Sequence, residues 1–218
     1  MSATSTSRVS REERREAILN AARRHFVSTG YHGTGMDDVA NTLGLSKPIV
    51  YQYFSSKHDL YLAVLEKAGK NLQDTISTAL NQSGSNRTIV RASVRAFFDF
   101  VDDDMQYYRL LFDSDMLDDI EAAEHVEQVM STVVTYIAHH ISHATTLDPA
   151  RAQLLASSVV GASTSAAKTW VKTARHELDI DTAADLIAGA LWSGLQAFPA
   201  RHTHPIGNHV KKDGEKAQ

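Results

Sequence analysis

Residues 34–54 read TGMDDVANTLGLSKPIVYQYF, and this stretch decides the architecture of the N-terminal part of the chain. Its apolar residues fall on one face of a short helix, and they are Met36, Val39, Ala40 and Leu43. Gly44 follows where a helix end takes a left-handed backbone, and Ser46 and Pro48 suit the first turn of a second helix. The spacing predicts two short helices joined by a tight turn, which is the helix-turn-helix arrangement.

The second of these helices would display polar side chains that a purely structural helix rarely carries. Lys47, Gln52 and Tyr53 project from it, with Tyr51 either at the surface or packed partly inward. Ammonium, amide and phenol groups suit DNA phosphates and base edges. The alternative is an ordinary hairpin of two helices in a bundle, and the polar side chains favour DNA binding over it.

The apolar periodicity of the remaining chain is also helical. The 218 residues include only four prolines and no cysteine, which excludes disulfides and zinc–thiolate sites. From residue 57 apolar residues recur at steps of four to Leu80, Asp148-Pro149 is a helix start, and Asp181 is expected to cap a last helix before Pro199. We predict about nine helices, with a compact group of three inside residues 1–55.

The segment from Glu16 to Leu65 resembles the DNA-binding domain of TetR-type bacterial repressors. The matching residues are Ile18-Leu19, Ala22, Phe26, Gly30-Tyr31, Thr34, Val39-Ala40, Leu43-Gly44-Leu45-Ser46, Val50-Tyr51, Tyr53-Phe54, Lys57 and Asp59-Leu60. The resemblance implies an all-α, nine-helix TetR-like fold, in which a three-helix head with a helix-turn-helix at residues 34–53 sits on a larger helical bundle. It implies four regions: a disordered arm at residues 1–10, a DNA-binding domain at 11–71, a ligand-binding and dimerisation domain at 72–199, and a disordered tail at 200–218.

By the same resemblance, a set of residues in the head contacts the operator. They are Thr34, Gly35, Met36, Ser46, Lys47, Pro48, Ile49, Tyr51, Gln52, Tyr53 and Lys57. Two positions depart from the family pattern. Gly35 replaces a second Thr or Ser and removes one hydroxyl for a phosphate, and Pro48 replaces a common Gly and removes one N–H donor.

The charge of the chain is divided unevenly along its length. The net charge of −4, taken alone, disfavours nucleic-acid binding. Residues 1–60, however, hold eight basic and six acidic residues, and the remainder holds 14 basic and 20 acidic ones. A mildly basic head on an acidic body directs one end of the molecule toward a duplex.

The aromatic residues gather in one part of the predicted body. Six of the chain's 16 aromatic residues fall within residues 97–112, with methionines nearby. Aromatic and methionine side chains suit the wall of an apolar ligand cavity, although the same residues would also fill an ordinary core. The predicted pocket residues are Phe97, Phe98, Val101, Tyr108, Arg109, Phe112, Met116, Met130, Val134 and Trp170. Arg109 is expected either to pair with an anionic ligand headgroup or, as the favoured alternative, to bond the acidic run 102–104.

A stretch of small residues suggests where two copies of the chain would meet. In residues 156–169, eleven of 14 residues are Ala, Ser, Gly or Thr, which lets helices approach closely, either between chains or within one. The predicted dimer interface comprises Leu155, Val159, Ala162, Ala166, Trp192 and Leu195. A protein that binds a palindromic operator needs two-fold symmetry, which favours a homodimer.

Other kinds of site lack support in the sequence. The histidines at positions 139, 140 and 143 have no cysteines or clustered carboxylates to complete a ligand set, so no metal site is predicted. No catalytic motif is found either, so we predict no cofactor, no catalytic residue and no enzyme activity. The longest uncharged run, residues 152–167, is short for a membrane span, and the N-terminus lacks an apolar signal stretch. We therefore expect a cytoplasmic protein without membrane contact.

Three segments also resemble actinobacterial regulators of fatty-acid biosynthesis, the FasR type. They are residues 46–65, 97–115 and 191–195. This resemblance implies a long-chain acyl-CoA effector and fatty-acid biosynthesis genes as targets. The expected function is a homodimeric DNA-binding repressor with a palindromic duplex operator and a small apolar effector. The alternatives are a TetR-type repressor of an efflux or catabolic operon, and a helical ligand carrier or enzyme that merely contains a helix-turn-helix.

Overall fold

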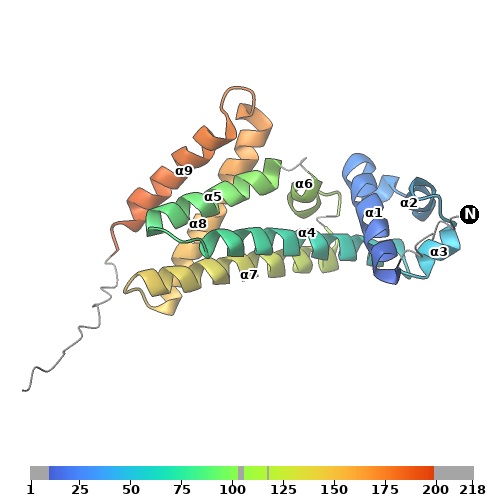
Figure 1. Cartoon of the computed structure of the whole chain (residues 1–218), viewed down its shortest axis with the longest axis horizontal. Coiled ribbons are helices and arrows are strands. Elements are labelled where there is room, and N and C mark those ends of the chain that lie inside the picture. The colour runs from blue at the N-terminus through green and yellow to red at the C-terminus, as the bar shows by residue number, and fades with distance from the viewer. Residues whose placement is uncertain (1–9, 103–105, 117, 199–218) are drawn as a thin grey trace, which may run out of the picture.

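The computed structural model describes residues 10–102, 106–116 and 118–198, and that part of the chain folds into nine α-helices and one π-helical turn. The head comprises α1 (Arg11–Gly33), α2 (Met36–Thr42) and α3 (Lys47–Tyr51). The helix α4 (Lys57–Leu80) leads from the head into the body. The body adds α5 (Asn86–Asp102), α6 (Gln106–Phe112), α7 (Ile120–Ala144), α8 (Pro149–Thr169) and α9 (Ile180–Leu195). Figure 1 shows the head at one end of an elongated molecule, with α4 and α7 running side by side along the body.

The nine-helix, all-α architecture predicted from the sequence is confirmed. The boundary expected between residues 71 and 72 falls inside α4, which continues from the head to the far end of the body without a break. The expected arm at residues 1–10, apart from Ser10, and the expected tail at residues 200–218 lie outside the described residues. No helix in the described ranges has the length and apolarity needed to cross a bilayer.

Side-chain caps fix where several helices begin. Ser10 and Glu13 form a capping box at the start of α1, where the Glu13 N–H donates to the Ser10 hydroxyl at 3.0 Å. Asp148 caps α8 as expected, accepting the Arg151 N–H at 2.9 Å. The prediction for α9 was wrong by two residues. Asp179 caps this helix by accepting the Thr182 N–H at 2.9 Å, whereas Asp181 lies inside the first turn and pairs with Arg95.

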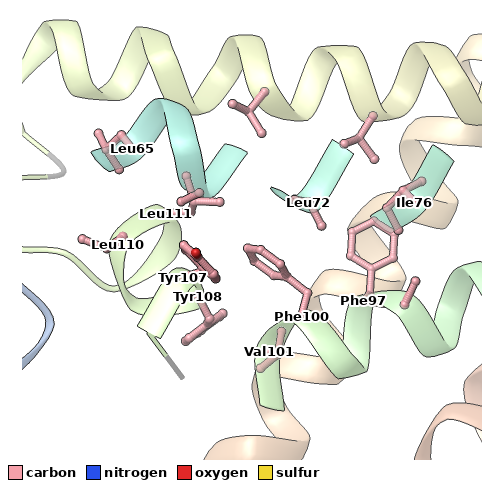
Figure 2. Packing of buried hydrophobic residues seen from close by; sticks show 14 of the residues in the cluster. Leu65, Leu72, Ile76, Phe97, Phe100, Val101, Tyr107, Tyr108, Leu110 and Leu111 are labelled. Atoms are coloured by element: carbon pink, nitrogen blue, oxygen red, sulfur yellow. The ribbon is translucent and has the colours of Figure 1, made fainter. Parts of the chain in front are cut away.

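The core follows the stripe that the sequence predicts along α4. The residues of this stripe are all buried, and they are Leu60, Val64, Ala68, Leu72, Ile76 and Leu80. Aromatic rings from α5 and α6 pack against the stripe, as Figure 2 shows, with Phe100 and Tyr107 stacked at 6.1 Å between ring centroids. Large rings therefore fill the body near the head, where α6 lies beside α1 and α4.

Candidate DNA-binding surface and effector cavity

The turn between α2 and α3 has the conformation that its sequence predicts. Gly44 has φ of 62°, in the left-handed region that favours glycine. The N–H of Leu45 donates to the carbonyl of Ala40 at 2.9 Å, which closes the end of α2, and the Leu45 side chain packs against the core. These contacts hold α3 at a fixed angle to α2.

Helix α3 carries one buried and one exposed face. Val50 within it and Phe54 just after it are buried, which anchors the helix to the head. Ser46, Lys47, Pro48, Tyr51 and Gln52 are exposed, while Ile49 and Tyr53 are half-buried. The exposed face is therefore polar and aromatic and is available to a groove of DNA.

Two arginines of α1 lie beside this surface, and neither is among the operator contacts predicted from the sequence. The guanidinium of Arg11 lies 5.9 Å from the centre of the Tyr53 ring, and that of Arg15 lies 5.3 Å from the centre of the Phe54 ring. Their spacing of four residues puts both side chains on one face of α1. That spacing, in a helix preceding the motif, is the signal that could have identified them.

Lys47 is the basic side chain of α3 itself. Its ammonium donates to the Asp37 carboxylate of α2 at 2.7 Å. The hydrogen bond to Asp37 and the attraction of its charge raise the pKa of Lys47 above the ordinary value. Because both side chains are exposed, this pair adds little stability, and a phosphate can take the place of Asp37.

Several of the predicted contact residues face the interior of the head. Thr34 is 2% exposed and donates its hydroxyl to the Gly30 carbonyl at 2.7 Å, and Met36 is buried in the core. The Gly35 N–H donates to Asp38 at 2.7 Å, as part of the start of α2. In the protein alone these three residues connect α1 to α2, and their contact with DNA stays a prediction.

Lys57 also has an internal role. Its ammonium donates to the carbonyls of Tyr31 at 2.9 Å and Thr34 at 3.0 Å, and it lies 4.3 Å from the centre of the Tyr31 ring. These acceptors occupy the end of α1 and the start of the next turn. Lys57 thus joins α4 to α1 in the protein alone, and its contact with a phosphate stays a prediction.

A carboxylate from the body closes the junction between the body and the head. The Asp115 side chain, which follows α6, accepts the N–H of Tyr31 at 2.9 Å and that of His32 at 3.2 Å. The helical path of α1 is interrupted just before, at Gly30, where φ is 75° and ψ is 172°. A Cβ atom on Gly30 would lie 2.6 Å from Asp115 Oδ2, so this contact needs glycine.

Charge and hydrogen bonding both favour ionised Asp115. Burial raises the pKa of Asp115, but the hydrogen bonds from the N–H groups of Tyr31 and His32 outweigh this effect, and the pKa lies below the ordinary value.

Two further contacts join the segment after α6 to α4. The hydroxyls of Tyr61 and Ser114 are 2.6 Å apart, and the His58 ring lies 3.2 Å from Asp119. The segment after α6 therefore holds both α1 and α4.

A cavity of 450 Å³ lies at the end of the body farthest from the head, where α4, α7 and α9 end and α5 begins (Figure 1). We call it the distal cavity. Its apolar wall comprises Leu80, Ile89, Val90, Val94, Phe97, Ile137, Ile141, Ala144, Val159, Trp192, Leu195 and Phe198. Six polar side chains also line it: Ser93, His140 and Ser163 within α5, α7 and α8, and Asn86, Thr145 and Gln196 at the helix ends. The volume falls in the range of about 300–1,000 Å³ found for small-molecule sites.

The distal cavity is not where the aromatic cluster predicted a pocket. Of the predicted residues, Phe97 lines it, and Met116 lines a separate space of 240 Å³ between α4, α6 and α7. Arg109 is exposed. The other predicted pocket residues pack in or against the core, and they are Phe98, Val101, Tyr108, Phe112, Met130, Val134 and Trp170. The aromatic rings near α6 pack closely against one another and against α4, so the space lies at the other end of the body.

The acidic run expected to bond Arg109 is only partly described. Asp102 pairs with Arg175 at 2.6 Å, and residues 103 and 104 lie outside the described residues. Asp102 is therefore engaged by Arg175, and the remainder of the acidic run expected to bond Arg109 falls outside the described residues.

Apolar residues are exposed on the outer sides of α8 and α9. Leu154 is 73% exposed and Leu186 is 65% exposed. Ala162, Gly161 and Gly189 lie on the same outward faces, and a Cβ added at either glycine would meet no atom within 4 Å. We call the exposed residues 154, 161, 162, 186, 189 and 190 the outer face of α8 and α9.

Only some of the predicted dimer residues lie on the outer face of α8 and α9 or beside it. Ala162 belongs to the outer face, and Leu155 and Ala166 are half-buried beside it. Val159, Trp192 and Leu195 line the distal cavity instead. The small-residue stretch has small residues on every side of α8, so its composition identifies the helix but not which side faces outward.

Two family models match the chain. Residues 18–64 match that of bacterial regulatory proteins of the tetR family, and residues 86–194 match that of tetracyclin repressor-like C-terminal domains. Over 193 residues, which are 88% of both chains, the sequence is 38% identical to the HTH-type transcriptional activator FasR of Mycolicibacterium smegmatis.

Solved structures with a similar fold cover most of the chain. A TetR-like transcriptional regulator from Rhodococcus sp. RHA1 is 27% identical, with a TM-score of 0.68 over 87% of this chain and 99% of that one. The regulator FadR from Bacillus subtilis, solved in complex with stearoyl-CoA, is 14% identical, with a TM-score of 0.64 over 82% of this chain and 98% of that one. The likeness to FadR concerns the fold alone.

Proposed function

This chain belongs to the TetR family of bacterial regulatory proteins and is a transcriptional regulator, and on that premise we propose how it acts. It binds a palindromic duplex operator as a homodimer, and an apolar effector in the distal cavity changes its affinity for that operator. The observation that carries the proposal is the pairing of an exposed polar α3 in the head with an apolar cavity in the body.

In this proposal α3 enters the major groove. Tyr51 and Gln52 reach base edges and phosphates from its exposed face, and Lys47 exchanges Asp37 for a phosphate. Arg11 and Arg15 add positive charge beside α3. The two heads of a dimer would enter successive major grooves about 34–36 Å apart.

The outer face of α8 and α9 supplies the dimer contact in this proposal. Exposed leucines provide apolar surface, and the glycines let two helix backbones approach closely. An Ala162→Arg variant should be monomeric by light scattering, because the guanidinium would be placed without a partner in the contact. If Ala162→Arg remained a dimer and bound the operator normally, the two copies would have to meet elsewhere.

We propose a long-chain acyl-CoA as the effector. Its support is the 38% identity to FasR, the apolar wall of the distal cavity, and the acyl-CoA complex of the structurally similar FadR. By the same reasoning the targets are fatty-acid biosynthesis genes. A different apolar compound would place the protein among regulators of efflux or catabolic operons.

The helix α4 connects the two sites. Its first residue, Lys57, holds the end of α1, and its last residue, Leu80, lines the distal cavity. An effector shifts the population of conformers only if it binds one of them more tightly. The cavity shape must therefore differ between the conformer that fits the operator and the one that does not.

A DNA-binding titration at several salt concentrations tests the proposal. Specific binding should compete against bulk DNA and weaken with salt by about 0.9 in log K per phosphate contacted. Transcription in vitro from a promoter carrying the operator, with and without dodecanoyl-CoA, distinguishes the repressor expected from the sequence from an activator such as FasR. If no fragment bound above bulk DNA, the protein would be a helical carrier or enzyme instead.

A further inference from the structure

Two serine hydroxyls in the wall of the distal cavity have unusual surroundings. Ser93 is 7% exposed and Ser163 is 0% exposed, and neither hydroxyl has a hydrogen-bond partner among the described residues. Both residues line the same cavity, from α5 and from α8. A buried hydroxyl without a partner costs free energy that an alanine at the same position would not.

Serines in helices commonly relieve this cost by bonding their own backbone. Ser158 of α8 donates to the Leu154 carbonyl at 3.1 Å, and Ser193 of α9 donates to the Gly189 carbonyl at 2.9 Å. Ser93 and Ser163 make no such bond, although they lie in the same kind of helix. Their hydroxyls therefore keep their hydrogen-bonding capacity for a molecule that reaches them from the cavity.

The charge of the lining restricts what that molecule can be. No lysine, arginine, aspartate or glutamate is among the described residues that line the cavity. Among the lining residues that the structure describes, His140 is the one titratable group, and its burial, together with the neighbouring His139 and His143, lowers its pKa, so the neutral ring prevails. An anionic group inside would be desolvated without a countercharge.

We propose that the effector carries an uncharged acceptor of the carbonyl class, as in an ester, thioester or amide, and that the Ser93 and Ser163 hydroxyls bind it inside the distal cavity. The apolar part of the effector then lies against the aliphatic and aromatic wall. This inference rests on the proposed function, because it takes the distal cavity as the effector site.

The ends of the surrounding helices fit the remainder of such a molecule. Asn86 begins α5, while Thr145 and Gln196 follow the last residues of α7 and α9, and all three line the cavity. These polar side chains lie at the end of the body, next to solvent. A charged or strongly polar portion of the effector would therefore remain at this opening, outside the apolar wall.

The test compares three ligands with the same chain, methyl dodecanoate, dodecane and dodecanoate, on the full-length protein by titration calorimetry. Ser93→Ala and Ser163→Ala should each weaken methyl dodecanoate binding about tenfold, the loss expected for one hydrogen bond, and leave dodecane binding unchanged. Dodecanoate should bind more weakly than the ester to the wild-type protein, because its carboxylate is charged.

Thr164→Val is the matched control. The Thr164 hydroxyl is also buried without a partner among the described residues, but Thr164 does not line the cavity. Its removal should leave the affinity for all three ligands unchanged. A loss of ester affinity equal to that of the serine variants would show a general packing effect and overturn the inference.

Further outcomes test the carbonyl assignment separately from the proposed function as a DNA-binding regulator. Unchanged ester affinity in the Ser93→Ala/Ser163→Ala double variant, or tighter binding of dodecanoate than of the ester, would overturn the carbonyl assignment. Failure of all three ligands to bind would overturn it as well. Operator titration of the same preparations without ligand tests the proposed regulator separately, since DNA binding by the head does not require these serines.

Discussion

Replacing Gly30 by alanine should damage the junction between head and body in a way that depends on Asp115. The backbone at Gly30, with φ of 75° and ψ of 172°, is open essentially to glycine only. Forcing alanine into it costs about 1–3 kcal/mol. The added Cβ would also lie 2.6 Å from Asp115 Oδ2 and displace the carboxylate.

The displaced carboxylate adds a second cost. Asp115 would lose its hydrogen bonds from Tyr31 and His32, and because Asp115 is exposed we expect about 2 kcal/mol for the two together. Gly30→Ala should therefore lower the free energy of unfolding by about 3–5 kcal/mol in the wild-type protein. In an Asp115→Ala background it should cost only the backbone share, about 1–3 kcal/mol.

A double-mutant cycle measures this difference directly. Urea unfolding of the four proteins at one fixed concentration should give a coupling of about 2 kcal/mol between the two positions. Operator titration should show the same pattern, since the bonds concerned orient α1 relative to the body. Additive losses would refute the reasoning, because they would mean that Gly30→Ala leaves the Asp115 bonds intact.

Three further predictions concern Lys47, Gly69 and the pH dependence of the Asp115 contact. Asp37→Asn should strengthen operator binding, because Lys47 then has no carboxylate partner to leave. Lys47→Ala should reduce the slope of log K against log salt by about 0.9 for each phosphate contact that is lost. If DNA titrations gave equal slopes for the two variants, Lys47 would not contact DNA. Gly69→Ala should lower the free energy of unfolding in urea by about 1–3 kcal/mol, because the added Cβ would overlap the Val129 side chain where α4 packs against α7. An unchanged free energy of unfolding would mean that the two helices can move apart at this contact without cost. The pKa of Asp115 is lowered by folding, so its stabilisation should be complete above about pH 4, the unfolded value, and be lost as the pH falls through the folded pKa. The stability difference between wild type and Asp115→Asn should accordingly shrink below pH 4 in pH-dependent unfolding, and a constant difference would contradict a role for the charge.

The head was predictable from the sequence because its signals are local. The left-handed Gly44, the start of α3 after Ser46 and the apolar face of α2 lie within a few residues of one another, and the TetR resemblance drawn from them is confirmed. The inward roles of Thr34 and Lys57 were not predictable in the same way. Both bond the backbone around Gly30 and Tyr31, and that contact depends on the kink at the end of α1.

The distal cavity and the outer face of α8 and α9 depend on contacts between distant segments. Aromatic residues drew the predicted pocket toward α6, yet rings that fill space well leave no cavity around themselves. The cavity instead lies at the far end of the body, where Ser93 of α5 and Val159 and Ser163 of α8 contribute to its wall. Helix phase along α8 decides whether Val159 or Ala162 turns outward, and composition alone does not fix it.

The unbroken α4 has a mechanical consequence. With 24 residues it is a rod about 36 Å long, and one end borders the distal cavity while the other is fastened to α1. A change of tilt of about 5° at the cavity would displace the far end of such a rod by about 3 Å. The same movement in both subunits of a dimer would change the spacing of the two heads by up to twice that amount. Leverage of this kind would let a ligand that widens the cavity only slightly move α3 out of register with the groove.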